Sequence, residues 1–264
     1  MSTRLTTRLG GLVGVLVILA VWWLASVTLF TGSGTIPTPG AVLAEMASPE
    51  RWASTLRNSV STITAASQGY LLGNGLAIAL AVVVLLVPRF EPLANQIAIV
   101  TYCVPPVAIG PVIVIVAGRD APSGASVVLA ALLCFFTTVV GCLVGLRAAP
   151  RASLDLVRAY GGTSWTVLRK VQIVSALPSL FAALKIAAPS AFLGAILAEY
   201  LGSGGEQTLG RALIAAQTQA NAPLLWYLAL VSGLFSGVAY LLVSLVARVA
   251  TPWASGTDVV AAGR

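Results

Sequence analysis

The sequence predicts an all-α polytopic membrane protein with six transmembrane helices, and its composition and charge distribution both support this fold class. Hydrophobic residues make up 58% of the chain and charged residues only 9%, whereas a soluble domain carries about a quarter charged residues. Charge-free windows cover 9–44, 58–88, 92–118, 121–146 and 212–247, and a sixth, 171–198, is interrupted only by Lys185. Each exceeds the roughly 20 residues that cross ~30 Å of hydrocarbon. These runs are continuous, unlike the short alternating strands of a β-barrel.

The six expected helices fill these windows, at about 10–30, 62–87, 92–117, 124–146, 178–199 and 223–248. The first follows Arg4 and Arg8, as a signal peptide would, but its apolar stretch is longer than a typical signal sequence and no clear A-x-A site follows. We therefore expect an uncleaved helix. Before the second helix, the turn at 37–40 is expected to start a short surface helix that runs through Met46. One membrane domain, 1–264, accounts for the chain.

The basic residues predict the orientation. An intracellular N-terminus places ten of them inside: Arg4, Arg8, Arg89, Arg147, Arg151, Arg158, Arg169, Lys170, Arg248 and Arg264. Four then lie outside: Arg51, Arg57, Arg119 and Arg211. This excess favours both termini in the cytoplasm and accounts for the net charge of +7. No basic run alternates with aromatic residues, so nothing indicates nucleic-acid binding.

Proline and polar residues within the expected spans are candidates for a translocation pathway or gate. Pro105 and Pro106 cannot donate helix hydrogen bonds, so we expect a kink or break in the third helix, with Tyr102 and Cys103 one turn earlier beside it. Packing alone also explains such a break. Gln68, in the second helix, needs a polar partner in lipid, which can be another helix or a pore.

Two charged residues lie in the expected fifth helix. Glu199, near its outer end, is interpreted either as a gate or pathway residue or as a structural polar contact. Lys185 is expected to extend to the headgroups or to pair between helices. The three cysteines, Cys103, Cys134 and Cys142, are expected to be small buried apolar residues. Three GxxxG motifs, starting at Gly10, Gly141 and Gly233, predict close helix contacts.

The loop at 147–177 has the pattern of a capped short helix followed by a hinge. Ser153 is the expected N-cap, with Asp155 in the first turn and Arg158 three residues later to pair with it. Two glycines, Gly161 and Gly162, are expected to end this helix. Thr163 is expected to cap a second helix that returns to the membrane.

The loop resembles the "EAA" loop of bacterial ABC-importer permeases. The sequence DLVRAYGGTSW at 155–165 carries the acid and the glycine of that motif, and Pro178 follows Gly161 at its usual separation of seventeen residues. Asp155 replaces the usual glutamate, and Leu156-Val157 replace the usual Ala-Ala. The PTP segment at 37–39, the Pro105-Pro106 pair and Glu199 are similar to features of the nitrate, taurine and aliphatic-sulfonate branch.

The resemblance implies a type I ABC-importer permease fold, with a coupling helix between the fourth and fifth helices that docks on a cytoplasmic ATPase. It assigns this coupling to residues Ser153, Asp155, Leu156, Val157, Arg158, Ala159, Gly161, Gly162 and Thr163. A short rigid helix of this kind transmits rigid-body rotation to the membrane helices. The implied location is a prokaryotic plasma (inner) membrane. The implied partners are two ATPase subunits, a second permease (identical or homologous) and an extracytoplasmic solute-binding protein.

The sequence leaves three classes of function to compare. With no histidine, paired carboxylates or activated nucleophile, a membrane enzyme is disfavoured. The chain has no G-x-x-x-x-G-K-[ST], so ATP and magnesium are expected to bind in a partner ATPase, and no cofactor is expected on this chain. Intramembrane acids are scarce, which disfavours the alternative of an ATP-independent secondary transporter or channel. We therefore expect a permease for a small organic or anionic nutrient.

Overall fold

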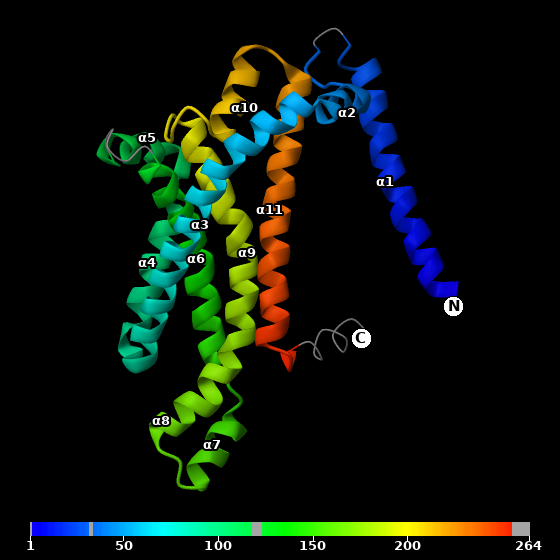
Figure 1. Cartoon of the computed structure of the whole chain (residues 1–264). Helices are drawn as coiled ribbons and strands as arrows, with labels where there is room; N and C mark the ends of the chain where they lie inside the picture. Colours follow the sequence, from blue (N-terminus) through cyan, green and yellow to red (C-terminus); the bar gives the residue numbers. More distant parts are fainter. Residues whose placement is uncertain (1, 32–33, 118–122, 255–264) are drawn as a thin grey trace.

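The computed structural model describes residues 2–31, 34–117 and 123–254, and the regular elements within these ranges are all helices. Its long helices run in alternating directions (Figure 1). They are α1 (Ser2–Thr28), α3 (Pro49–Leu86), α4 (Glu91–Cys103), α6 (Gly124–Arg147), α9 (Ile173–Tyr200) and α11 (Ala222–Ala250). The short helices α2 (Pro39–Ala47) and α10 (Leu209–Thr218) lie at one end of the bundle, and α7 (Arg151–Ala159) lies at the other (Figure 1).

Four described helices are long and apolar enough to cross a membrane. They are α3, α6, α11 and the continuous helix Ser164–Tyr200, which includes α9. A fifth span exists if the bent pair α4 and α5 (Pro106–Ala117) forms one crossing. In α1 the apolar part, Val13–Thr28, is shorter. An all-helical membrane protein is confirmed, while the sixth span, at 10–30, stays a prediction.

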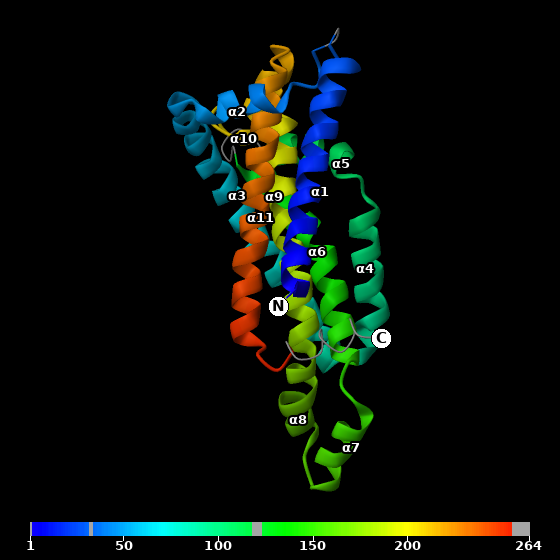
Figure 2. The ribbon, with the colours of Figure 1, turned by 90° about the vertical axis from the view of Figure 1, so that its right-hand side faces the viewer.

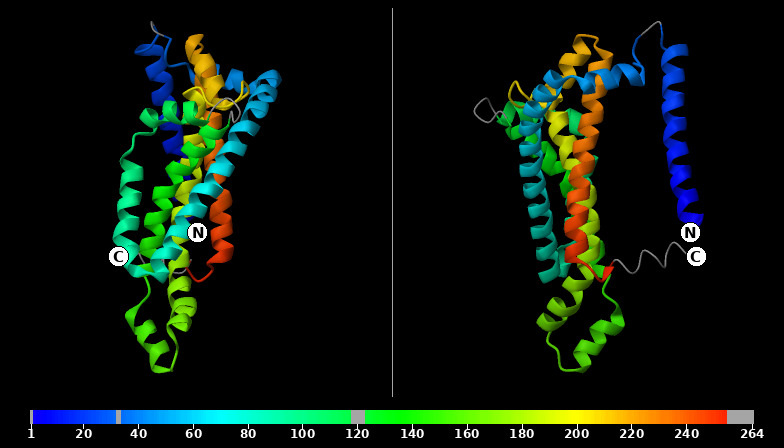
Figure 3. Two further views of the ribbon diagram at one scale, coloured as in Figure 1. Left: turned by 90° about the vertical axis from the view of Figure 1, so that its left-hand side faces the viewer. Right: turned by 45° about the vertical axis from the view of Figure 1, so that its right-hand side comes forward.

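Helix α1 stands beside the bundle rather than inside it (Figures 1 and 3). Its upper end is held by the indole of Trp22, which stacks on Trp226 of α11 with ring centroids 5.3 Å apart. The same indole donates a hydrogen bond to the carbonyl of Pro37 at 3.0 Å, and the Ser26 hydroxyl donates to the carbonyl of Ile36 at 2.8 Å. Figure 2 views the molecule from the side on which α1 lies.

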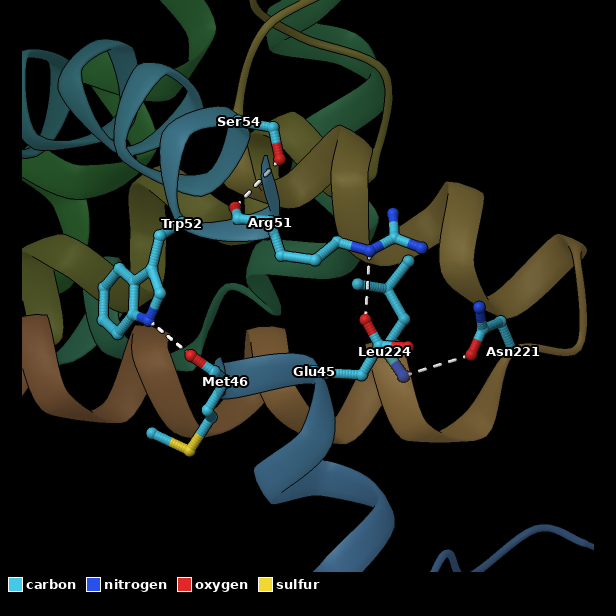
Figure 4. Close-up of polar contacts among 7 residues, drawn as sticks. All are labelled: Glu45, Met46, Arg51, Trp52, Ser54, Asn221 and Leu224. Carbon is cyan, nitrogen blue, oxygen red and sulfur yellow. Dashed lines mark hydrogen bonds and ion pairs between the residues drawn. The ribbon is translucent and has the colours of Figure 1, made fainter. Parts of the chain in front are cut away.

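The corner between α2 and α3 is a compact polar joint (Figure 4). The expected surface helix is α2, which begins at Pro39 with the Thr38 hydroxyl as its N-cap. Arg51 pairs with Glu45 at 3.0 Å, and the Trp52 indole donates to the carbonyl of Met46 at 2.7 Å (Figure 4). Helix α3 therefore begins at Pro49, thirteen residues before the expected start of the second span at 62.

Helix α6 is the centre of the bundle, and glycines allow its close packing against α3 and α9. A Cβ on Gly73 of α3 would lie 2.3 Å from the carbonyl oxygen of Ala131, and one on Gly141 of α6 would lie 2.3 Å from the Ala183 Cβ. The GxxxG prediction is therefore confirmed at Gly141. It is wrong within this chain at Gly10 and Gly233, where a Cβ would meet nothing within 4 Å.

The expected third helix is broken at the proline pair. Helix α4 ends at Cys103, α5 begins at Pro106, and the two are bent by 92°. Val104 is extended, with φ −73° and ψ 117°. The prediction of a kink or break at Pro105-Pro106 is thus confirmed, and the single expected helix 92–117 is two helices.

Candidate coupling and translocation sites

Helix α7 projects beyond the ends of α4 and α11, away from the bundle (Figures 1 and 2). It spans Arg151–Ala159 with Pro150 as its N-cap. The prediction of Ser153 as the N-cap is wrong, because the helix begins two residues earlier and Ser153 lies inside it. Asp155 consequently lies in the second turn and not the first. Proline has no N–H to leave unpaired and its φ of −63° suits a helix start.

The end of α7 is a Schellman motif, as the glycine pair predicted. The N–H of Gly162 donates to the carbonyl of Val157 at 2.9 Å, and the N–H of Gly161 donates to the carbonyl of Arg158 at 2.9 Å. Gly161 has φ of +78°, a conformation that glycine adopts without the cost of a Cβ. Gly162 is required for a different reason, which is lack of space: a Cβ at this position would lie 2.5 Å from the Val157 side chain.

The next helix begins at a side-chain cap. The Thr163 hydroxyl accepts from the N–H of Thr166 at 3.4 Å, and α8 (Ser164–Val167) follows. A π-helical turn, η2 (Leu168–Gln172), joins α8 to α9 without a break. Pro178 lies inside this long helix. The predicted cap at Thr163 is confirmed, and the helix that follows, Ser164–Tyr200, is long and apolar enough to cross a membrane and joins α7 to the bundle.

Two exposed apolar side chains form a ridge at the C-terminal end of α7, and a third exposed apolar side chain lies on α8. The exposed fractions are 58% for Leu156, 87% for Tyr160 and 65% for Trp165. Leu156 and Tyr160 are four residues apart, so they share one face of the helix. Arg158 and Asp155 form the predicted pair at 3.7 Å, and both side chains are largely exposed. An apolar ridge on a helix outside the bundle is typical of a protein-binding surface.

A pocket of about 630 Å³ lies where the α4–α5 break meets α6 and α9. Of the predicted pathway residues, Tyr102 and Pro106 line it. The Tyr102 ring stacks on Phe136 of α6, with centroids 4.3 Å apart. The hydroxyls of Thr137 on α6 and Ser190 on α9 belong to the same lining. These two residues were missed, because nothing in the sequence indicates which faces of α6 and α9 meet the break.

The other predicted pathway residues lie outside this pocket. Cys103 and Pro105 are exposed at the break and do not line it. The burial predicted for cysteine holds for Cys134 and Cys142 but is wrong for Cys103. Gln68 lies on an exposed side of α3. Lys185 is half-buried, and no carboxylate in the described ranges pairs with it.

Glu199 is a buried structural contact at the opposite end from α7. Its side chain is 1% exposed, and Oε2 accepts from the Thr62 hydroxyl at 2.8 Å and from the N–H of Gly210 at 3.0 Å. The Thr62 hydroxyl in turn accepts from the N–H of Leu209 at 3.1 Å. The carboxylate thus joins α3, α9 and the first turn of α10. Of the two interpretations, this geometry favours the structural polar contact over a pathway residue.

The fold, with its projecting short helix, resembles that of a solved transporter. The chain is similar in structure to a protein described as "Crystal structure of an amino acid ABC transporter with histidines". The TM-score is 0.63 and the sequence identity is 15%, and the match covers 78% of this chain and 97% of that one. The class that the fold defines is an all-helical membrane protein similar to an ABC transporter permease. At this identity the likeness concerns the fold alone.

The sequence comparisons identify the family. The family model described as "binding-protein-dependent transport system inner membrane component" matches residues 73–255, and the chain belongs to this family. The riboflavin transport system permease protein of Chloroflexus aurantiacus is 27% identical over 92% of this chain and 90% of its own length. The formylaminopyrimidine transport permease protein of Halalkalibacterium halodurans is 25% identical, over 73% and 76%. The putative aliphatic sulfonates transport permease protein of Bacillus subtilis is 24% identical, over 74% and 71%.

Family membership establishes the general role. The chain is the permease component of a binding-protein-dependent ABC transport system, located in the inner membrane. It is a non-catalytic transport subunit, and such systems include an ATPase and a binding protein.

Proposed function

We propose that this chain forms the translocation pathway of a prokaryotic ABC importer for a small organic or anionic nutrient. ATP hydrolysis in a partner ATPase drives the transport, and ATP and magnesium bind there and not to this chain. The whole chain, 1–264, acts as one membrane domain with six spans and both termini in the cytoplasm. The nutrient classes follow from the relatives, whose names specify riboflavin, formylaminopyrimidine and aliphatic sulfonates.

The observation that carries the proposal is the geometry of α7. It is a short helix with a fixed Schellman end, it projects from the bundle, and it is joined through α8 to one continuous membrane helix. If a docked ATPase rotates α7, the motion is therefore transmitted through α8 to α9 as a rigid-body tilt. The coupling role covers residues 153–164, with the ridge of Leu156 and Tyr160 facing the ATPase.

Further features support the assembly. Most of the basic residues inside the described ranges lie near the α7 end, as in the positive-inside pattern. On α9, Ile186 and Leu193 are 57% and 61% exposed in the single chain. We assign this face to contact with a second permease across the pathway. The end of the bundle that carries α2 and α10 receives the solute-binding protein. At the other end, one ATPase docks on α7 of each of the two permeases.

The test is co-purification of an ATPase with the tagged permease, followed by uptake into vesicles with ATP supplied on the α7 side. We expect the ATPase to bind, and uptake to require ATP and the binding protein. Single cysteines locate the sides: position 156 should react only with reagent on the cytoplasmic side and position 43 only with reagent outside. Uptake without ATP, or labelling of position 156 from outside, would contradict the proposal.

A further inference from the structure

We propose that the pocket at the α4–α5 break is a solute subsite that takes an uncharged, donor-rich ring compound and excludes anions. This inference rests on the proposed function and narrows its substrate class. It depends on three features of the pocket: an aromatic wall, unpaired backbone acceptors and a lining without charged side chains.

The aromatic wall consists of Tyr102 from α4 and Phe136 from α6, which stack on each other. Their rings are stacked, with an interplanar angle of 26°. Tyr102 is 69% exposed in spite of this contact, so one face of the pair remains available to a flat ring. At about 630 Å³, the pocket is in the range of small-molecule sites.

The break supplies hydrogen-bond acceptors. The carbonyl of Tyr102 would bond the N–H of residue 105 or 106 in a continuous helix, but both are prolines and have none. The carbonyl of Thr101 is in the same position, since residue 105 lacks an N–H and Val104 makes no capping bond within the described residues. Both residues line the pocket. Backbone groups left unpaired at membrane depth are tolerated where they line a cavity.

The hydroxyls of the lining add to the same character. Ser190 and Thr101 donate to carbonyls of their own helices, at 3.0 and 2.8 Å, and so present lone pairs to the pocket. The Thr137 hydroxyl makes no hydrogen bond within the described ranges, so it can accept as well as donate. The pocket is therefore richer in acceptors than in donors, which favours a solute that carries N–H or O–H groups.

Charge is absent from this lining among the described residues. Lys185, the lysine inside the α9 span, lies seven residues before Phe192 and thus on nearly the same helix face. Phe192 lines a separate pocket of about 520 Å³ between α3, α9 and α11. With no cation to compensate it, an anion among carbonyl oxygens would lose more hydration than the few hydroxyl donors of the lining can replace. The lining thus fits neither a nitrate-like nor a sulfonate solute.

The test measures charge selectivity in the pocket with thiol reagents. The three native cysteines are replaced (Cys103→Ser, Cys134→Ala, Cys142→Ala), and single cysteines are introduced by Thr137→Cys and Ser190→Cys in the full-length permease in nanodiscs. The reagents are methanethiosulfonates with hydroxyethyl, trimethylammonioethyl and sulfonatoethyl groups. Gln219→Cys, an exposed position next to α10, is the matched control. The reaction rate of each reagent with the protein is divided by its reaction rate with 2-mercaptoethanol in solution.

At positions 137 and 190 we expect the sulfonate reagent to react at least about tenfold more slowly than the hydroxyethyl reagent, a difference of about 1.4 kcal/mol. The control should show no such ratio. Equal rates for the two reagents would overturn the proposal, and so would failure of all three to react, since the pocket would then be closed to water. ATPase co-purification, measured on the same preparations, tests the proposed function separately. If the ATPase binds but the sulfonate and hydroxyethyl reagents react at equal rates, the subsite is refuted and the proposed function is not.

Discussion

The two ends of the bundle use a carboxylate in opposite ways. At one end Glu199 is 1% exposed and accepts hydrogen bonds from α3 and α10. At the other end Asp155 belongs to α7, where its 3.7 Å pair with Arg158 lies in solvent. A buried acid with two donors fixes the relative position of helices, whereas an exposed pair contributes little to stability. The comparison indicates that the end with Glu199 is a rigid joint between helices, whereas the end with α7 exposes a surface for binding a partner.

The largest effect is expected from Glu199→Ala. Loss of the carboxylate leaves the N–H of Gly210 buried without an acceptor and opens a cavity, at a cost of about 3 kcal/mol in free energy of unfolding. The thermal midpoint in detergent measures this, with Glu206→Ala, an exposed loop acid, as the control. An unchanged midpoint would show that the outer end is not held by Glu199.

The proline break should give the next largest effect. Pro105→Ala and Pro106→Ala together restore two N–H donors to the helix, so α4 and α5 can straighten and the acceptors of the pocket become paired. We expect normal membrane insertion but about tenfold slower ATP-driven uptake, equivalent to about 1.4 kcal/mol. Pro111→Ala, within α5, is the matched control. Uptake at the wild-type rate would mean that the break serves packing only.

The ridge on α7 should show a moderate effect. Leu156→Ala and Tyr160→Ala each remove an apolar contact with the ATPase, which we expect to weaken its binding by about 1 kcal/mol. Leu43→Ala, at an exposed site on α2 at the other end, should leave ATPase binding unchanged. The affinity of the purified subunits measures the difference. If the α7 variants bind as well as wild type, the ridge is not the docking surface.

The smallest effect is expected from Asp155→Asn. The change removes a solvent-exposed pair and should alter stability by no more than about 0.5 kcal/mol. ATPase binding should also change little, because the apolar ridge carries it. The thermal midpoint and the ATPase affinity are compared with those of Glu199→Gln. A larger loss in Asp155→Asn than in Glu199→Gln would reverse the comparison between the two ends.

The features that could be predicted from the sequence are local ones. Gly161 and Thr163 indicate a helix end and a helix start through backbone and side-chain preferences that act within four residues. The Pro105-Pro106 break is equally local. The sequence misplaces the start of α7, because Ser153 is a good cap residue but the N-cap of the helix is Pro150. Span lengths followed from hydropathy, but the extension of α3 to Pro49 depends on its joint with α2.

The features that escaped the sequence depend on contacts between distant residues. Glu199 and Thr62 are 137 residues apart in the sequence. Only the packed bundle shows that the Glu199 carboxylate is buried and accepts hydrogen bonds from Thr62 and Gly210. Thr137 and Ser190 became candidates for the same reason, since their position relative to the break is set by the packing of α6 and α9. Exposure of Cys103 follows from the break itself, which removes the neighbouring turn from its helix.

The central claim, that α7 couples the membrane helices to an ATPase, is tested most directly at Gly161. Its φ of +78° strains any residue with a Cβ, by about 1–2 kcal/mol, and a β-branched one most. No neighbour would contact a new Cβ there, so the backbone alone decides the outcome. ATPase co-purification and ATP-driven uptake are measured for wild type, Gly161→Asn, Gly161→Ala and Gly161→Val at matched membrane levels. Both should fall in that order, with Asn closest to wild type because it tolerates positive φ, and full uptake by Gly161→Val would contradict the coupling role of α7.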